Sequence, residues 1–222
     1  MENLYGVLVS MYEKGELDFS LCKSFNLDEY VGFDGSNVNS YRYFMNHFLF
    51  DKVNIDKRNT HVPNGVAEDL DAAAAEYEVA MDACGGVDMQ LLGIGRTGHI
   101  GFNEPLSSFA SRTRAVTLTK TTYEQNSPLF ENPADMPMRA VTMGVGTILE
   151  AKKLLLVATS KEKADIVSKM IEGPVTSMIS ATALQLHEDA VVVLDEDAAS
   201  KLEGKEEYKW AFAHDPRWAD YQ

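Results

Sequence analysis

Apolar residues recur at helical spacing in four stretches of the chain and form short continuous runs in four others. The helical spacing predicts helices over residues 2–14, 40–50, 68–84 and 161–172. The continuous runs predict strands over residues 21–27, 87–94, 153–159 and 190–194. Because helices alternate with strands that are apolar on both faces, the pattern predicts an α/β fold, a Rossmann-like three-layer α/β/α sandwich with a mainly parallel sheet.

The chain shows no internal division. No repeat, low-complexity tract or linker interrupts it, so residues 1–222 are expected to form a single domain. Residues 126–138 contain three prolines and are expected to form an irregular connection, an ordinary surface loop in preference to a lid. The charged, aromatic tail from Glu203 is expected to pack across the domain or against another subunit.

Composition narrows the class of protein. With 45% hydrophobic residues in 222, the chain can fill a sizeable core. Its apolar runs are short and its start lacks the regions of a secretion signal, so a soluble cytoplasmic protein is expected and a membrane partner is not. Cys22 and Cys84 form no CxxC or zinc-like cluster, which favours reduced thiols.

The negative net charge of the chain limits the kinds of molecule that it is expected to bind. A net charge of −14, from 34 acidic and 20 basic residues, argues against a nucleic-acid partner, because phosphate backbones are bound by basic surfaces. An anionic small molecule would need a local basic pocket.

Residues 92–105, LGIGRTGHIGFNEP, join a predicted strand to a glycine-rich loop. Glycines let backbone approach a ligand closely, and His99 and Glu104 would lie at the carboxyl end of the strand, where open α/β sheets bind ligands. Glu104 could orient the imidazole and favour its protonated form. Asp28 and Glu29 follow another predicted strand, and neighbours on an extended chain point to opposite faces, so only one can face a given cleft.

Two other interpretations of this loop are weaker. The five-residue spacing of His99 and Glu104 does not place two ligands on one helical face, and no third ligand is recognisable nearby, so a catalytic metal is not expected. Residues 93–98 also match GxGxxG, a pattern used for dinucleotides. Pro105 interrupts the helix that such a motif should open, and residues 115–119 contain no acid for the ribose, so a nicotinamide cofactor is not expected.

Several separated segments carry a resemblance to a known family. Residues 25–32 read FNLDEYVG and residues 92–105 contain G-x-G-x-x-G-H-I-x-F-N-E-P, in that order. Both blocks resemble motifs of the glucosamine-6-phosphate deaminase family. The likeness continues through SRTR at 111–114, VTMGVGT at 141–147 and ALQLH at 183–187, and covers the chain from about its first helix to about residue 195.

The resemblance implies an activity and a catalytic set. The family opens glucosamine 6-phosphate, moves a proton from C2 to C1 and releases ammonia to leave fructose 6-phosphate. The resemblance implies that Asp28 is the base that removes the C2 proton, and that His99 is the acid/base that opens the ring, supported by Glu104. Relatives commonly carry Asp or Asn where Thr97 stands, so Thr97 is expected to position a partner and not to act as an acid or base.

The resemblance also implies how a sugar phosphate would be held. No metal or other cofactor is implied, and relatives occur as monomers and as several oligomers, so a homo-oligomer is possible. Lys163 matches a family lysine that contacts the phosphate, near a helix start that suits an anion. The residues expected to bind the substrate are Glu29, Gly95, Arg96, Gly98 and Lys163.

Besides Thr97, the chain departs from the family in three places. Relatives begin with a further strand and a [ST]-G-[GS]-[TS]-P phosphate loop, which are expected to be lacking here, and Pro128 replaces a phosphate-binding arginine. Arg112 and Arg114 match a segment that some relatives use at an allosteric or subunit contact, but Val116 stands where those relatives have lysine. Two other functions therefore stay open: a 6-phosphogluconolactonase-like hydrolase, and a catalytically weak sugar-phosphate-binding homologue.

Overall fold

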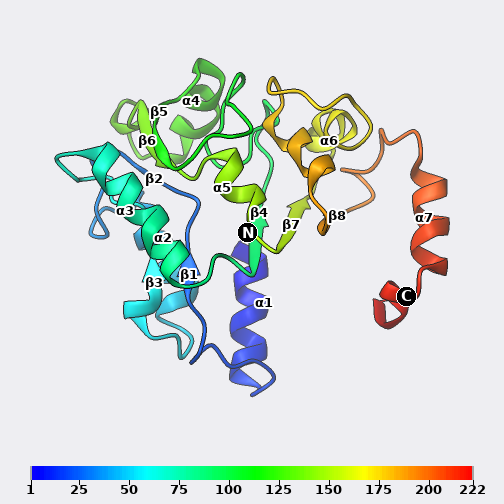
Figure 1. Cartoon of the computed structure of the whole chain (residues 1–222), viewed down its shortest axis with the longest axis horizontal. Coiled ribbons are helices and arrows are strands. Elements are labelled where there is room, and N and C mark those ends of the chain that lie inside the picture. Colours follow the sequence, from blue (N-terminus) through cyan, green and yellow to red (C-terminus); the bar gives the residue numbers. More distant parts are fainter. Residues whose placement is uncertain (1, 222) are drawn as a thin grey trace.

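The structure is a computed structural model that describes residues 2–221 (Figure 1). It is a mixed α/β fold with both parallel and antiparallel strand pairing. The α-helices are α1 (Glu2–Glu13), α2 (Tyr41–Met45), α3 (Leu70–Ala83), α4 (Lys120–Asn126), α5 (Val145–Leu149), α6 (Ala164–Ile171) and α7 (Lys205–His214). The strands are β1 (Ser24–Phe25), β2 (Asp28–Tyr30), β3 (Thr60–His61), β4 (Met89–Leu92), β5 (Arg114–Thr117), β6 (Arg139–Thr142), β7 (Lys153–Ala158) and β8 (Ala190–Leu194).

The strands form three sheets. Strands β4, β7 and β8 are parallel, in the order β4-β7-β8, and β1 pairs in parallel with β3. Strands β2 and β5 both pair with β6 in antiparallel fashion. The α/β class predicted from the sequence is confirmed, but the antiparallel sheet was not predicted.

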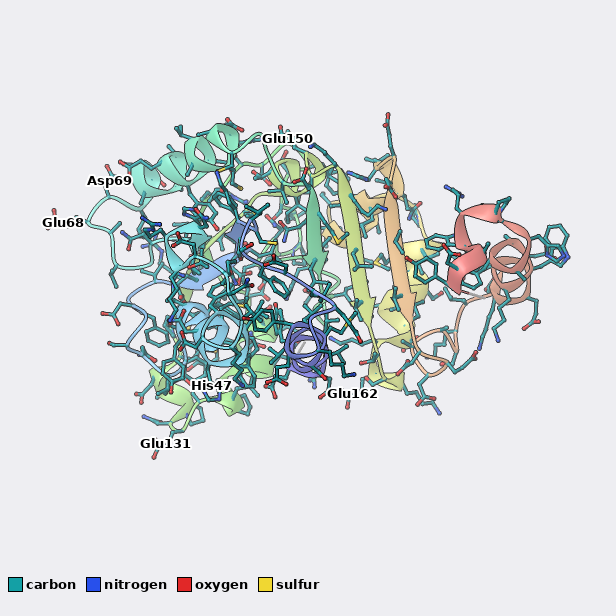
Figure 2. All side chains as sticks on the ribbon, turned by 90° about the horizontal axis from the view of Figure 1, so that it is seen from below. His47, Glu68, Asp69, Glu131, Glu150 and Glu162 are labelled. Atoms are coloured by element: carbon teal, nitrogen blue, oxygen red, sulfur yellow. The ribbon has the colours of Figure 1, made fainter. Side chains whose placement is uncertain are left out.

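The β4-β7-β8 sheet carries the main core. Exposure alternates along β7, where Leu154 and Leu156 are fully buried and their neighbours are partly exposed, because successive side chains of a strand point to opposite faces. Leu92 of β4 is also fully buried, and α6 contributes Val167 and Met170 to the same cluster. Figure 2 shows these three strands side by side and the labelled acidic side chains at the periphery, so much of the negative charge lies on the surface.

Two smaller clusters complete the interior. The β2-β6-β5 sheet packs under aromatic rings, with Tyr30, Phe102 and Phe130 in contact. A third cluster joins α1 to α2 and to the π-helical turn η1 (Asn46–Phe50) that continues it. The predicted helix over 40–50 is therefore confirmed, although its second half is more loosely wound than an α-helix.

Helix α3 links the small β1-β3 sheet to the rest of the fold. Asp69 starts the helix, because its carboxylate accepts hydrogen bonds from the backbone N–H groups of Asp71 and Ala72. Further along, the buried Tyr77 hydroxyl donates to the carbonyl oxygens of Asn26 and His61, at 2.8 and 3.2 Å. One tyrosine thus holds the ends of β1 and β3 in place.

Three local expectations differ from the structure. The strand predicted over 21–27 is regular only at Ser24–Phe25. Residues 126–138, expected to be irregular, contain the 3-10 turns η3 (Ser127–Leu129) and η4 (Pro133–Asp135), since proline suits the first turn of a helix. The tail forms α7 and η7 (Pro216–Tyr221), which lie to one side of the domain in Figure 1.

Among residues 2–221, every helix is too short or too polar to cross a lipid bilayer.

Candidate active site

The loop after β4 turns so tightly that His99 folds back over Gly95. The Gly95 N–H donates to the His99 carbonyl at 2.9 Å, and the Gly98 N–H donates to the Gly95 carbonyl at 3.0 Å. A Cβ at position 95 would lie 2.1 Å from His99 Nε2, so only glycine leaves room for the imidazole. Gly98 has a φ of +80° and is packed against Ile179 and Ile166, which also requires glycine. The glycines of the motif therefore serve to position His99.

The His99 imidazole is buried, and its Nδ1 contacts two neighbouring side chains. Its Nδ1 lies 3.3 Å from Glu104 Oε2 and 2.8 Å from the Thr97 hydroxyl oxygen. The Thr97 hydroxyl also reaches Glu104 Oε2 at 3.5 Å. The side chains of His99 and Glu104 are only 9% and 8% exposed, so this pair is shielded from water. The imidazole is oriented by a carboxylate on one nitrogen, while Nε2 faces Gly95.

Glu104 is held as a carboxylate. Burial alone would raise the pKa of this carboxyl group. The opposing effects are larger and lower the pKa to about 2: they are hydrogen bonds from His99, the Thr122 hydroxyl and the Thr119 N–H, and the nearby imidazole charge. The Thr119 N–H lies 3.1 Å from Oε1 and belongs to the residue that caps α4. An anchored, charged carboxylate can stabilise an imidazolium during proton transfer.

Asp28 reaches the same place from the antiparallel sheet. It begins β2 and lies opposite Thr142 of β6, whose hydroxyl oxygen accepts a hydrogen bond from the Phe102 N–H at 3.0 Å. A Cβ placed on Gly101 would lie 3.6 Å from Asp28 Oδ2. Thr142 therefore joins the strand that carries Asp28 to the loop that carries His99.

The Asp28 carboxyl is set up to hold a proton near neutral pH. Burial, and next to it the charge of neighbouring Glu29, raise its pKa to about 8. A carboxylate of raised pKa is a stronger base once ionised, which suits the removal of a proton from carbon.

Glu29 lies on the other face of β2, as alternation along an extended chain requires. It is 2% exposed and accepts hydrogen bonds from the backbone N–H groups of Tyr30, Tyr41 and Arg42, at 2.9 to 3.0 Å. Its carboxylate thus holds the first turn of α2, and a direct contact with a ligand would cost one of these bonds.

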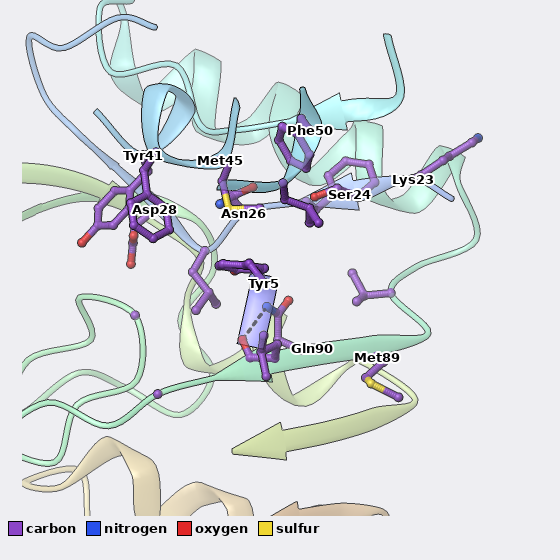
Figure 3. Close-up of a pocket in the computed structure, with 18 of the residues that line it drawn as sticks. Tyr5, Lys23, Ser24, Asn26, Asp28, Tyr41, Met45, Phe50, Met89 and Gln90 are labelled. Carbon is purple, nitrogen blue, oxygen red and sulfur yellow. Dashed lines mark hydrogen bonds between the residues drawn. The ribbon is translucent and has the colours of Figure 1, made fainter. Parts of the chain in front are cut away.

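A groove of about 930 Å³ opens beside these groups (Figure 3). Asp28, Gly95 and His99 line one end of it, together with Gln125 and Asn126 at the end of α4. Glu104 and Thr97 lie behind His99 and do not line the groove. The structure thus brings Asp28, His99 and Glu104 together around one hollow, with two of the three side chains open to it.

Three predicted substrate-binding residues lie around the loop and do not line the groove. The Lys163 ammonium donates to the Ile94 carbonyl at 2.7 Å, and burial lowers its pKa, with a smaller contribution from Arg96. The exposed Arg96 guanidinium lies 3.7 Å from the Glu162 carboxylate. Gly98 serves the packing of the loop. Within residues 2–221, no group of three His, Cys, Asp or Glu side chains lies close enough to hold a metal ion.

Several residues that position the site were not predicted as site residues. Asn103 is fully buried, and its amide donates to the Ile100 and Met143 carbonyls at 2.9 and 2.8 Å, which fixes the loop against β6. The Ser180 hydroxyl donates to the Asn103 carbonyl at 2.7 Å. Asn103 and Thr142 both lie in shared motifs, so a signal for them was present, whereas nothing marks Ser180 or Thr119 in the sequence alone.

The fold and the groove place the protein in a recognisable class: α/β proteins in which acid–base side chains face a hollow large enough for a small metabolite. The chain belongs to the family of glucosamine-6-phosphate isomerases and 6-phosphogluconolactonases, whose pattern matches residues 1–193.

Similar proteins place the chain within one branch of that family. It is 54% identical to glucosamine-6-phosphate deaminase of Shewanella loihica over 207 residues, which are 93% of this chain and 77% of the relative. It is 53% identical to the glucosamine-6-phosphate deaminase of Cellvibrio japonicus over 206 residues, 93% of this chain and 78% of the relative. The solved structure of a monomeric glucosamine-6-phosphate deaminase matches with a TM-score of 0.88 and 42% identity, over 90% of this chain and 83% of that one.

A more distant structure shares the fold alone. The 6-phosphogluconolactonase of Trypanosoma brucei matches with a TM-score of 0.64 at 19% identity, over 90% of this chain and 82% of that one.

Proposed function

We propose that the protein is a glucosamine-6-phosphate deaminase of amino sugar metabolism, which converts glucosamine 6-phosphate and water into fructose 6-phosphate and ammonia. The observation that carries the proposal is that Asp28 and the His99–Glu104 pair meet at one end of a single groove. The relatives at 54% and 53% identity are named for this activity, which supports the same assignment here.

His99 is assigned to ring opening. The pyranose opens when a proton leaves the O1 hydroxyl and a proton reaches the ring oxygen, and one imidazole can carry both transfers. Its Nδ1 is occupied by Thr97 and Glu104, so Nε2, on the groove side, is the nitrogen that exchanges protons with the sugar. Glu104 offsets the charge that the imidazole gains during the transfer.

Asp28 is assigned to the carbon chemistry. In the open sugar, ionised Asp28 removes the C2 proton while the His99 imidazolium donates a proton to O1, which gives an enolamine, and Asp28 then returns its proton to C1. This leaves an iminium at C2, to which water adds. Ammonia departs as the C2 ketone of fructose 6-phosphate forms, and the proton released in this step returns to His99. Two positioned proton carriers are sufficient for these steps.

Lys163 is assigned to the phosphate. Its ammonium donates to the Ile94 carbonyl at the start of the catalytic loop, and it is half-buried beside Arg96. A modest side-chain movement would exchange the carbonyl for a phosphate oxygen. Arg96 and the backbone of Gly95 are assigned to the same ligand, and Glu29 to its support through α2.

We also propose that residues 1–222 act as one domain of a Rossmann-like kind in the cytoplasm, without a cofactor. The two parallel sheets support the fold assignment, and one strand of each, β1 and β4, lines the groove. A homo-oligomer is compatible with the assignment and is open to direct measurement.

The test is the simultaneous measurement of ammonia and fructose 6-phosphate from glucosamine 6-phosphate. The proposal expects the two products in equal amounts, and it expects Asp28→Asn to abolish both. A wild-type rate no higher than that of Asp28→Asn would reject the function. Hydrolysis of 6-phosphogluconolactone, assayed in parallel, separates the deaminase from a lactonase.

A further inference from the structure

Ser160 adopts a backbone conformation that a residue with a side chain rarely takes. Its φ is +82° and its ψ is 152°. Among residues 2–221, Ser160 and Leu106 are the two residues other than glycine with a positive φ. The combination of φ and ψ at Ser160 belongs almost entirely to glycine, and other residues keep it only where their surroundings hold them there. Such strain is typical of segments close to a functional site, and Ser160 lies three residues before Lys163.

The Ser160 backbone sets the direction of the chain after β7. Its carbonyl accepts a hydrogen bond from the Lys163 N–H at 3.1 Å. This bond closes the 3-10 turn η5 (Lys161–Lys163), which leads directly into α6. Because η5 starts at Ser160, a change of φ at Ser160 would turn the whole of η5. The place of the Lys163 side chain therefore depends on the conformation of Ser160.

The support for this conformation comes from the neighbouring strand. Strands β7 and β8 are parallel and paired up to their carboxyl ends (Figure 2). Asp195 directly follows β8, and both of its carboxylate oxygens accept the Ser160 N–H, at 3.0 Å for Oδ2 and 3.2 Å for Oδ1. Oδ1 also accepts the Ala198 N–H at 2.7 Å. The hydrogen bonds from Ala198 and Ser160 lower the pKa of Asp195, so an ionised carboxylate holds the Ser160 N–H at neutral pH.

Lys163 connects this turn to the catalytic loop. Its ammonium donates to the Ile94 carbonyl at 2.7 Å, directly before Gly95. Hydrogen bonds thus run without a break from Asp195 through Ser160 and Lys163 to the loop that carries His99. Asp195 and Ser160 do not line the groove themselves. Any effect of these two residues on the sugar would therefore pass through Lys163.

We propose that Asp195 is a positioning residue for Lys163, and that it acts by holding Ser160 in its strained conformation. The inference rests on the assignment of Lys163 to the substrate phosphate in the proposed function. Without the Asp195 carboxylate, Ser160 relaxes to a negative φ, and only a fraction of the molecules keeps η5 in place. The apparent affinity for the phosphate then falls in proportion to that fraction.

The test compares wild type, Asp195→Ala, Ser160→Gly and the double variant that combines the two substitutions. Glycine adopts a positive φ without strain, so Gly at position 160 does not need the Asp195 carboxylate. Asp197→Ala is the matched control, because it removes one charge from the same exposed turn and leaves the bonds between Asp195 and Ser160 in place. The kcat and KM for glucosamine 6-phosphate are measured for each protein.

Asp195→Ala should raise KM by at least about fivefold, since strain of this kind shifts an equilibrium by roughly five- to 150-fold. Its kcat should change by less than about twofold, because Lys163 holds the phosphate equally in the substrate and in the transition state. The double variant should return KM to within about twofold of the wild type, because glycine is not strained. Ser160→Gly and Asp197→Ala should each have the wild-type KM.

Hydrogen exchange at the Lys163 amide, measured by NMR without ligand, tests the geometry independently of activity. This amide donates to the Ser160 carbonyl, so its exchange should be faster in Asp195→Ala and should return to the wild-type rate in the double variant. If the wild type shows no turnover, the proposed function fails, and the exchange rates still decide the role of Asp195. If the wild type is active and Asp195→Ala has an unchanged KM, the function stands and the positioning role is wrong.

Two other results would overturn the proposal. One is a double variant with the KM and the Lys163 exchange rate of Asp195→Ala, because Asp195 would then act only as the acceptor for the Ala198 N–H. The other is a raised KM in Ser160→Gly alone, which would assign the Ser160 hydroxyl to the ligand.

Asp195→Asn takes the place of Asp195→Ala if the alanine variant does not fold. Asparagine has one acceptor oxygen for the two N–H groups of Ser160 and Ala198. The KM should therefore rise again and be restored by Ser160→Gly, and an unchanged KM in folded Asp195→Asn would reject the positioning role.

Discussion

The raised pKa of Asp28 makes the stability of this protein depend on pH in a defined direction. Burial and the Glu29 charge raise the pKa from 3.8 to about 8. Between these values the folded protein keeps the Asp28 proton that the unfolded chain releases, so the unfolded state gains relative stability as pH rises. Replacement of Asp28 by Asn, which is neutral at every pH and similar in shape, removes this effect.

The size of the effect follows from the shift. Where the folded state holds one more proton than the unfolded chain, stability falls by about 1.4 kcal/mol per pH unit. Between pH 5 and pH 7, the wild type should therefore lose about 2 to 3 kcal/mol relative to Asp28→Asn. Urea unfolding of both proteins at pH 5, 6 and 7 measures this difference, and contributions from all other groups largely cancel in the comparison.

A control residue separates this effect from a general loss of charge. Asp88 lines the same groove, but its side chain is 87% exposed and paired with Lys152, a surface contact of small energetic effect. The Asp88→Asn variant should follow the wild type across the pH range. The reasoning about Asp28 is refuted if the stability gap between wild type and Asp28→Asn stays constant within about 0.5 kcal/mol.

Three further predictions concern the catalytic loop and its base. The kcat/KM for glucosamine 6-phosphate should rise with pH through about 8 as Asp28 ionises, and a pH profile that falls over this range would contradict its role as base. Gly95→Ala should abolish activity, because the added Cβ would lie 2.1 Å from His99 Nε2. The control variant Gly6→Ala should be fully active, because no atom lies within 4 Å of its added Cβ. Equal kcat values for the two variants would contradict this steric explanation. Glu104→Gln should lower kcat by about 10²- to 10⁴-fold. The Glu104 pKa falls from 4.5 to about 2 on folding, so Glu104→Gln should also be less stable than the wild type by about 3 kcal/mol at pH 7. This difference in stability should disappear as pH falls from 4.5 towards 2. A difference that does not change with pH would exclude the ionic contribution of Glu104.

The parts of the fold that depend on local periodicity were predictable from the sequence. Helix α1 and strand β8 lie within one residue of their predicted bounds, since each shows its own apolar pattern over its whole length. The prediction for α3 was also close, because Asp69 provides a recognisable start. The alternation of Asp28 and Glu29 between two faces followed from strand geometry alone.

The antiparallel sheet was not predictable in this way. Strands β2, β5 and β6 have only three or four residues each, too few for a period to be measured. Their pairing connects residues far apart in sequence, as with Asp28 and Thr142. Long-range register of this kind depends on tertiary packing, which a sequence pattern of a few residues does not encode.

The positions of the candidate site residues can be compared with the sequence predictions, whereas their catalytic roles stay predictions. The motifs drew attention to His99, Glu104 and Asp28, and the structure places Asp28 and His99 at one groove, with Glu104 behind His99. The role of Thr119 could not be predicted, because it acts through a backbone N–H that any residue would supply. The Lys163 side chain was expected to face the ligand, yet its bond to a loop carbonyl is visible only in three dimensions.

The central claim is that Asp28 removes a proton from C2 of the sugar within the groove that His99 lines. Glucosamine 6-phosphate deuterated at C2 tests it most directly, with product formation and the deuterium content of C1 in fructose 6-phosphate measured together. The account predicts that the wild type reacts more slowly with the labelled sugar and carries part of the deuterium to C1, while Asp28→Asn forms no product. Turnover by Asp28→Asn with the same isotope effect and the same transfer to C1 would contradict the account.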